Sequence, residues 1–198
     1  MKELFLVVWA QMQVGLEGSL GIAHRIPVPR SQPWKNVFLR VGGEQRYPGL
    51  HAGGGVSLRY LYEKRRFLGS GGLLRLYEVK VGGREERFLV ASVPVHWGTQ
   101  IGSSAWRLWG GLLASFLLQA QSQPEAVQVY RFLDYFSSSQ LQLHSGIEWR
   151  WTSRRTIGLQ TLWDITPAWD RILFQSSRTL AHHLVISLSM QYAIWEGQ

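Results

Sequence analysis

The sequence predicts an all-β fold, an eight-stranded antiparallel up-and-down transmembrane β-barrel. Three observations support this prediction. Apolar and polar residues alternate with a period of two over most of the chain, and helical periodicity is nearly absent. Eight segments alternate in this way, and most reach the roughly 9–11 residues that a strand needs to cross a bilayer. The connections are short on one side and long on the other, which is typical of an up-and-down barrel.

Each segment places apolar residues on one face and small or polar residues on the other, because successive side chains of a strand point to opposite faces. In the sixth segment, Leu141, Leu143 and Ile147 share the apolar face, whereas Gln142 and His144 lie opposite them. The third segment alternates less cleanly, and its register stays open. In order, the segments are residues 13–25, 50–62, 67–81, 87–97, 106–119, 140–151, 157–164 and 183–194.

The connections divide into two groups by length. A stretch at residues 37–47 offers an alternative, because it could add a hairpin inside the first long connection and raise the number of strands to ten. Short connections are expected at residues 62–66, 98–105 and 152–155, long ones at 26–49, 119–139 and 165–180, and an intermediate one at 81–86.

The composition excludes several classes of protein. The chain has 198 residues, no cysteine and a net charge of +8, and 17% of its residues are charged. The absence of cysteine excludes a disulfide scaffold, a thiolate zinc site and a cysteine nucleophile. No window holds ~18 consecutive apolar residues, so a membrane-spanning helix is excluded. A membrane role therefore requires strands or a surface helix.

The apolar run of residues 4–10 is similar to the end of a secretory signal. Val8 and Ala10 stand at the −3 and −1 positions of a cleavage before Gln11. We therefore interpret residues 1–10 as a signal-peptide remnant and residues 11–198 as a single outer-membrane β-barrel domain. The alternative interpretation of the run is an apolar first strand.

Tryptophan and tyrosine indicate which face points outward. Seven of them fall on the apolar face near the short connections. Such a ring is typical of the aromatic girdle of a membrane barrel, because these side chains prefer the headgroup layer. A soluble lipocalin-like barrel, with its apolar face inward, is the alternative. The predicted girdle residues at the membrane interface are Tyr60, Tyr62, Trp97, Trp106, Trp149, Trp151 and Tyr192.

The opposite face is expected to fill the lumen, which is narrow in an eight-stranded barrel. Its charged and polar residues form a predicted lumen polar cluster. Buried charges need partners of opposite sign, so we interpret the cluster as a plug of ion pairs. A gated polar path or a proton relay is the alternative. The members of the cluster are Glu17, Arg59, Arg107, His144, Glu148 and Arg150.

No catalytic residue, metal ligand or cofactor is predicted. His24, His51 and His183 lie near the long connections of neighbouring segments, but no carboxylate accompanies them in the pattern. His144 and Ser145 are adjacent and therefore point to opposite faces. Ser187 and His183 share a face but are two pleat repeats apart, too far for a hydrogen bond within one strand.

The basic residues fall mainly in the connections and form no stripe interleaved with aromatic residues. We therefore expect no binding to nucleic acid. Anionic headgroups or lipopolysaccharide phosphates near the membrane surface are the simpler partners for these charges.

Four short and degenerate stretches carry a family resemblance: residues 88–97, 108–113, 132–135 and 184–192. They resemble, in order, the strand pair around an Ile-Pro-Leu step, the glycine-rich fifth strand, the start of the sixth strand and the terminal strand of the PorT-like outer-membrane β-barrel domain of Bacteroidota. Family members usually end on the aromatic residue of the last strand, whereas Glu196, Gly197 and Gln198 follow Trp195 here. The resemblance implies an outer-membrane location and no single activity.

We therefore expect an integral protein of the Gram-negative outer membrane, with periplasmic termini and extracellular long connections. Its expected role is structural or interaction-based. A candidate for that role is assistance to envelope protein export or assembly. The protein is not expected to be an enzyme. The alternatives are an outer-membrane lipid-modifying enzyme and a soluble lipocalin-like ligand-binding barrel. The expected partners are outer-membrane lipid, lipopolysaccharide and other envelope proteins, and the chain is expected to be a monomer.

Overall fold

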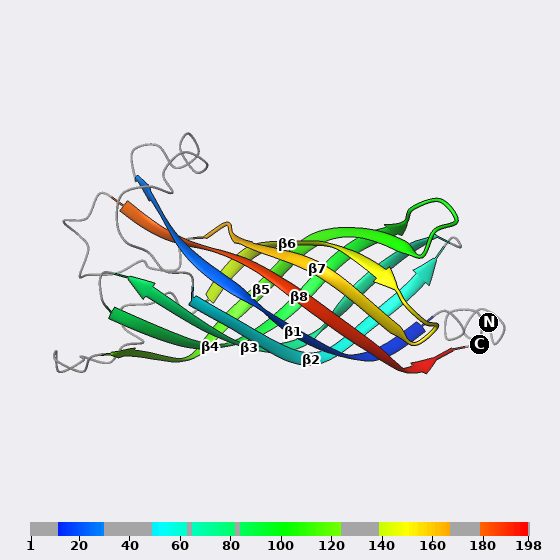
Figure 1. The fold of residues 1–198 in the computed structure, drawn as a ribbon, viewed down its shortest axis with the longest axis horizontal. Coiled ribbons are helices and arrows are strands. Elements are labelled where there is room, and N and C mark those ends of the chain that lie inside the picture. The colour runs from blue at the N-terminus through cyan, green and yellow to red at the C-terminus, as the bar shows by residue number, and fades with distance from the viewer. Residues whose placement is uncertain are drawn as a thin grey trace.

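The computed structural model describes residues 12–29, 49–62, 65–81, 84–123, 139–166 and 179–197. These residues form eight strands that close into a single antiparallel barrel, as Figure 1 shows. The predicted eight-stranded antiparallel up-and-down barrel is therefore confirmed. The strands are β1 (Met12–Pro29), β2 (Gly49–Tyr62), β3 (Arg66–Val81), β4 (Arg84–Gln100), β5 (Trp106–Gln123), β6 (Ser139–Arg150), β7 (Arg155–Asp164) and β8 (Thr179–Glu196).

The barrel closes where β1 pairs with β8. This pairing runs from Gln13 opposite Glu196 to Pro29 opposite Thr179. A closed ring satisfies the backbone groups of every strand, which a bilayer requires because it offers no water to unpaired N–H and C=O groups. The described ring is complete with eight strands, and the predicted extra hairpin at residues 37–47 lies outside the described residues.

The predicted signal-peptide remnant, residues 1–10, also lies outside the described residues. No helix in the described ranges has the length and hydropathy needed to cross a membrane.

Several strands are longer than their alternating patterns at the end opposite the short turns, which is the left end of Figure 1. Residues 26–29 belong to β1, residues 120–123 to β5 and residues 84–86 to β4, although all were predicted to lie in connections. Ladder pairing uses backbone groups, so it continues past the point where the side-chain pattern fades.

The two faces of the barrel have opposite character. Outward side chains such as Leu20, Leu74 and Leu188 are exposed, whereas inward side chains such as Arg75 and Ser92 are buried. This arrangement is apolar outside and polar inside, as in a membrane barrel. It contradicts the alternative of a soluble lipocalin-like barrel.

The register of β3, which the sequence left open, is set by its neighbours. Phe67, Arg75 and Tyr77 point inward and are buried, and Leu68 and Leu76 are exposed. Inward glycines on β3 make these large neighbours possible, because the lumen has little free space.

A bulge changes the parity at the end of β5. The pairing between β4 and β5 shifts between Leu89 and Val90, so that Leu89 faces Gln119 and Val90 faces Leu117. As a result Gln119 is exposed, although strict alternation predicts that it points inward. A bulge inserts one extra residue into a strand, and this reverses the side-chain faces beyond it.

An apolar cluster fills the lumen toward the end of the long connections. Seven buried side chains from six strands meet there, and Leu73, Leu117 and Ala120 pack against them. The cluster consists of Ala23, Tyr77, Phe88, Val90, Leu113, Leu162 and Val185.

Gly69 on β3 illustrates how the lumen accommodates its large residues. The His96 ring of β4 lies directly over it, and a Cβ at position 69 would stand 2.0 Å from Nε2 of that ring. The ring is itself held by Phe67 and Trp109, with centroid separations of 6.0 and 4.9 Å. His96 therefore has no room to move away from a larger residue at position 69.

Gly69→Ala is expected to destabilise the folded barrel by about 1–3 kcal/mol, the usual cost of overpacking a filled core. Gly72→Ala is the matched control, because a Cβ at position 72 meets nothing within 4 Å. Urea unfolding in detergent micelles, followed by tryptophan fluorescence, measures both. Equal stability of the two variants would show that the lumen is loosely packed around His96.

Candidate functional site

The lumen of the barrel holds the polar and charged residues and is the candidate site. Near the short turns, Arg59 of β2 and Glu148 of β6 form a bidentate ion pair, with both Nη–Oε distances at 2.6 Å. The two side chains are 3% and 4% exposed. Because β2 and β6 stand four strands apart in a ring of eight, this pair crosses the lumen.

Arg107 of β5 completes this layer. Its Nη1 lies 3.4 Å from Oε1 of Glu148, so one carboxylate serves two guanidinium groups. The Phe67 ring packs against both arginines, with its centroid 4.9 Å from Cζ of Arg59 and 5.7 Å from Cζ of Arg107. Cation–π contact of this kind stabilises a guanidinium group that has left water.

A second layer joins an imidazole to a carboxylate through amides. His144 Nε2 lies 2.8 Å from Oε1 of Gln160. Gln160 and Gln191 both donate to the Glu17 carboxylate, at 3.1 and 2.8 Å. The Trp109 ring stands edge-on to His144 with a centroid separation of 4.4 Å. Glu17 is thus satisfied by neutral amides instead of an arginine.

A third layer is centred on Arg75 of β3. Its Nε donates to Ser92 Oγ at 2.9 Å, and its Nη2 donates to Ser115 Oγ and to Gln142 Oε1, each at 2.7 Å. The guanidinium group also lies 5.0 Å from the centroid of the Tyr77 ring. Arg75 therefore links β3 to β4, β5 and β6 through the interior.

Asp164 at the end of β7 is the acidic partner of this layer. It is fully buried and accepts a hydrogen bond from the Gln142 amide. Its Oδ2 accepts the backbone N–H of His183 at 2.8 Å and lies 3.0 Å from His183 Nδ1. The chain Arg75–Gln142–Asp164–His183 therefore connects four strands.

The sequence missed Arg75 and Asp164. Arg75 was missed because the register of the third segment stayed open. Asp164 had a usable signal, since it is an acidic residue with inward parity at the end of the seventh segment. Its role depends on Gln142 and His183, which belong to other strands, and no local pattern predicts that meeting.

The predicted lumen polar cluster is brought together in part. Arg59, Arg107, His144 and Glu148 are buried in the lumen, and Glu17 is half-buried. Arg150 differs, because it is exposed. It is the last residue of β6, so its inward parity directs it to the open end of the barrel and not into the packed interior.

The predicted girdle residues occupy the outward face near the short turns. Five of them, Trp97, Trp106, Trp149, Trp151 and Tyr192, are 39–55% exposed. Tyr60 and Tyr62 are half-buried, since they stack on one another with centroids 6.3 Å apart. The Trp97 indole donates to the Tyr62 hydroxyl at 2.5 Å. Their contact with the membrane interface stays a prediction.

The histidines do not converge on a metal site within the described part of the chain, where no group of three His, Asp or Glu side chains could hold an ion. His51 and His183 instead both pack near the Tyr77 ring, with ring centroids 5.1 and 6.3 Å from it. His144 points inward, whereas Ser145 bonds Thr161 at 2.8 Å on the outer face. This adjacent pair therefore makes no nucleophile–base couple.

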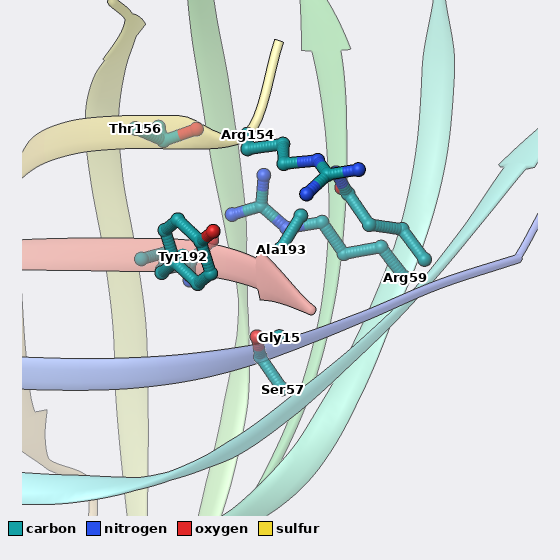
Figure 2. Close-up of a pocket in the computed structure, with 9 residues that line it drawn as sticks. Gly15, Ser57, Arg59, Arg154, Thr156, Tyr192 and Ala193 are labelled. Atoms are coloured by element: carbon teal, nitrogen blue, oxygen red, sulfur yellow. The ribbon is translucent and has the colours of Figure 1, made fainter. Parts of the chain in front are cut away.

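A small cavity lies at the short-turn end of the lumen, and Figure 2 shows the side chains around it, with Arg59 of β2 and Arg154 of the turn between β6 and β7 reaching toward it. Its volume is about 10 Å³, which is close to the space of one water molecule. Ser57 and Thr156 also line it. The cavity can hydrate the ion pair of Arg59 but is too small for an organic ligand.

No family model and no curated protein sequence matches the chain. Among solved structures, Neisserial surface protein A (NspA) is similar, with a TM-score of 0.56 at 11% identity over 90% of this chain and 96% of that one. The outer membrane enzyme PagL gives 0.47 at 9% identity over 91% and 99%. OprG from Pseudomonas aeruginosa gives 0.45 at 10% over 93% and 96%. The likeness to NspA shows that the chain has the fold of a small outer-membrane barrel.

Glu148→Gln is expected to destabilise the barrel by about 3–5 kcal/mol, because it leaves Arg59 and Arg107 buried without their counter-charge. Glu85→Gln is the control. Glu85 pairs with Arg87 at 2.6 Å on the outer surface, and loss of such a pair costs about 0–1 kcal/mol. Urea unfolding in detergent compares the two variants. Equal losses would contradict the placement of Glu148 at the centre of the lumen network.

Proposed function

We propose that the protein is an integral outer-membrane β-barrel with a structural or interaction role, and not a channel or an enzyme. The observation that carries this proposal is the filled lumen. Three polar layers and one apolar cluster occupy it, and the Arg59–Glu148 pair crosses it at 2.6 Å. An eight-stranded barrel has an interior just wide enough for side chains, so little space is left for a solute.

A non-catalytic role is supported by the way the candidate nucleophiles are placed. Ser145 faces outward and bonds Thr161, away from the inward His144. His183 is held by Asp164, and Ser187 stands two pleat repeats away from it on the same face of β8. Neither serine therefore lies beside a base in a geometry that would activate it.

Within this structural or interaction role, we propose more specifically that the protein is a PorT-like barrel that assists envelope protein export or assembly. It rests on the resemblance of residues 88–97, which form most of β4, and on a lumen that leaves the outer surfaces as the places for partners. We further propose a monomer whose termini and short turns are periplasmic. Outer-membrane lipid and lipopolysaccharide then surround the barrel, and other envelope proteins contact its ends.

Conductance across a planar lipid bilayer tests the closed lumen. The purified protein is expected to give no discrete conductance steps above the protein-free baseline, because paired charges and packed rings block the axis. A general diffusion porin added under the same conditions serves as the positive control. Regular steps from the folded protein would overturn the structural role and favour a channel.

Trypsin treatment of intact cells tests the location and orientation. Residues 30–48 contain Arg30, Lys35, Arg40 and Arg46, whereas the short turns contain Arg65 and Arg154. In the proposed orientation, intact cells are cleaved within the long connections, which also contain Arg131, Arg171 and Arg178, and permeabilised cells are cleaved at the short turns as well. Cleavage at Arg65 or Arg154 in intact cells would show the opposite orientation. Recovery of the protein in the soluble fraction would overturn the membrane assignment.

A further inference from the structure

A groove lies on the outer surface of the barrel, where β7, β8 and β1 lie side by side near the short turns. We propose that this lateral groove binds one anionic phospholipid, with an acyl chain along the barrel wall and the phosphate at Arg155. The groove has a volume of about 460 Å³, within the roughly 300–1,000 Å³ of ligand sites. Its lining includes Leu16, Gly18, Trp151, Arg155, Met190 and Tyr192. Glu17 and Gln191 also line it, and the Gln191 amide donates to the Glu17 carboxylate at 2.8 Å.

The strand register explains the shape of the groove. Arg155, Tyr192 and Leu16 are successive partners across the three strands and form one row of outward residues. In the next row, Met190 faces Gly18. The first row thus offers a cation, an aromatic ring and an aliphatic side chain, and the second row offers an apolar wall beside a position without a side chain.

Gly18 provides the floor of the groove. It points outward, and a Cβ built there would meet no heavy atom closer than Gly53 O at 4.0 Å. Its partner on β2 is Gly54, so two side chains are missing next to each other. The walls stay high because Leu16 and Met190 are 51% and 57% exposed. An acyl chain can therefore lie in this gap and contact side chains on both sides.

Charge at the mouth of the groove selects the headgroup. Arg155 is exposed, and within the described residues it has no carboxylate at salt-bridge distance. Trp151 is 55% exposed and adjoins Arg155, since its backbone N–H donates to Arg155 O at 2.9 Å; indole rings of this kind favour the headgroup layer. Arginine matches phosphate geometry well, so the mouth fits an anionic phosphodiester.

The position of the groove selects the kind of lipid. It opens at the short-turn end, which faces the periplasm in the orientation proposed above, and the inference rests on that proposal for its choice of leaflet. Phospholipids form the periplasmic leaflet of an outer membrane, whereas lipopolysaccharide occupies the other leaflet. We therefore assign the groove to a phospholipid such as phosphatidylglycerol and not to lipid A.

Native mass spectrometry of the protein in detergent tests the groove directly. Phosphatidylglycerol, phosphatidylcholine with the same acyl chains, and lipid A are added in separate titrations. The wild type is expected to retain one phosphatidylglycerol in preference to the other two. Arg155→Gln should weaken this binding about fivefold, the usual effect of one arginine near an anionic lipid surface. Gly18→Leu should abolish the preference, because its side chain fills the floor.

Two matched controls separate the groove from general effects. Gly110→Leu adds the same side chain on β5, four strands from β1, where a Cβ meets only Ser145 Cβ at 3.9 Å. Arg65→Gln removes an exposed turn arginine outside the groove. Both should bind like the wild type.

Equal retention of phosphatidylglycerol and phosphatidylcholine, or equal loss in the control variants, would overturn the site. A preference for lipid A would overturn the choice of phospholipid. Heat-modifiable gel mobility is used first to check that each variant is folded. If Gly18→Leu does not fold, Gly18→Val takes its place. Because binding in detergent does not depend on orientation or conductance, the groove and the proposed function can fail separately.

Discussion

Closure of β1 onto β8 is the constraint on which the other features depend. A bilayer leaves no partner for an unpaired backbone group, so the ring has to be complete. With eight strands the ring is narrow, and this converts the lumen into a packed interior. The outer surface then takes the apolar residues, because it is the side that meets lipid. The inside-out distribution of polarity therefore follows from closure.

The packed lumen buries charged side chains away from water, and each of them therefore needs partners. Two arginines near the short turns share the single carboxylate of Glu148, and Phe67 covers both of them. Farther along the axis, Arg75 is bound by hydroxyls and an amide, and the charge of Asp164 is met by Gln142 and His183. Each of these buried charges thus has partners on more than one other strand. Such a network holds the wall strands together from within.

The outer surface has its own organisation. Exposed aromatic rings gather near the short turns, and the exposed arginines Arg65, Arg154 and Arg155 lie at the same end. Apolar area, indole rings and cations therefore occur in the order in which a phospholipid presents its chains, carbonyl region and phosphate. In the lateral groove, this arrangement lies beside Gly18, whose missing side chain leaves room for an acyl chain.

The sequence by itself determined the strand count and the two faces, because alternation is a local property of an extended chain. The inward positions of Arg59, Arg107, His144 and Glu148 followed from parity alone. Only the tertiary structure decided which of these residues meet, since a partner across the lumen depends on closure and stagger of the whole ring. It also decided the register of β3 and the exposure of Gln119, where a bulge breaks strict alternation. The meeting of Arg155, Tyr192 and Leu16 arises in the same way, because β7 and β8 reach β1 only when the barrel closes.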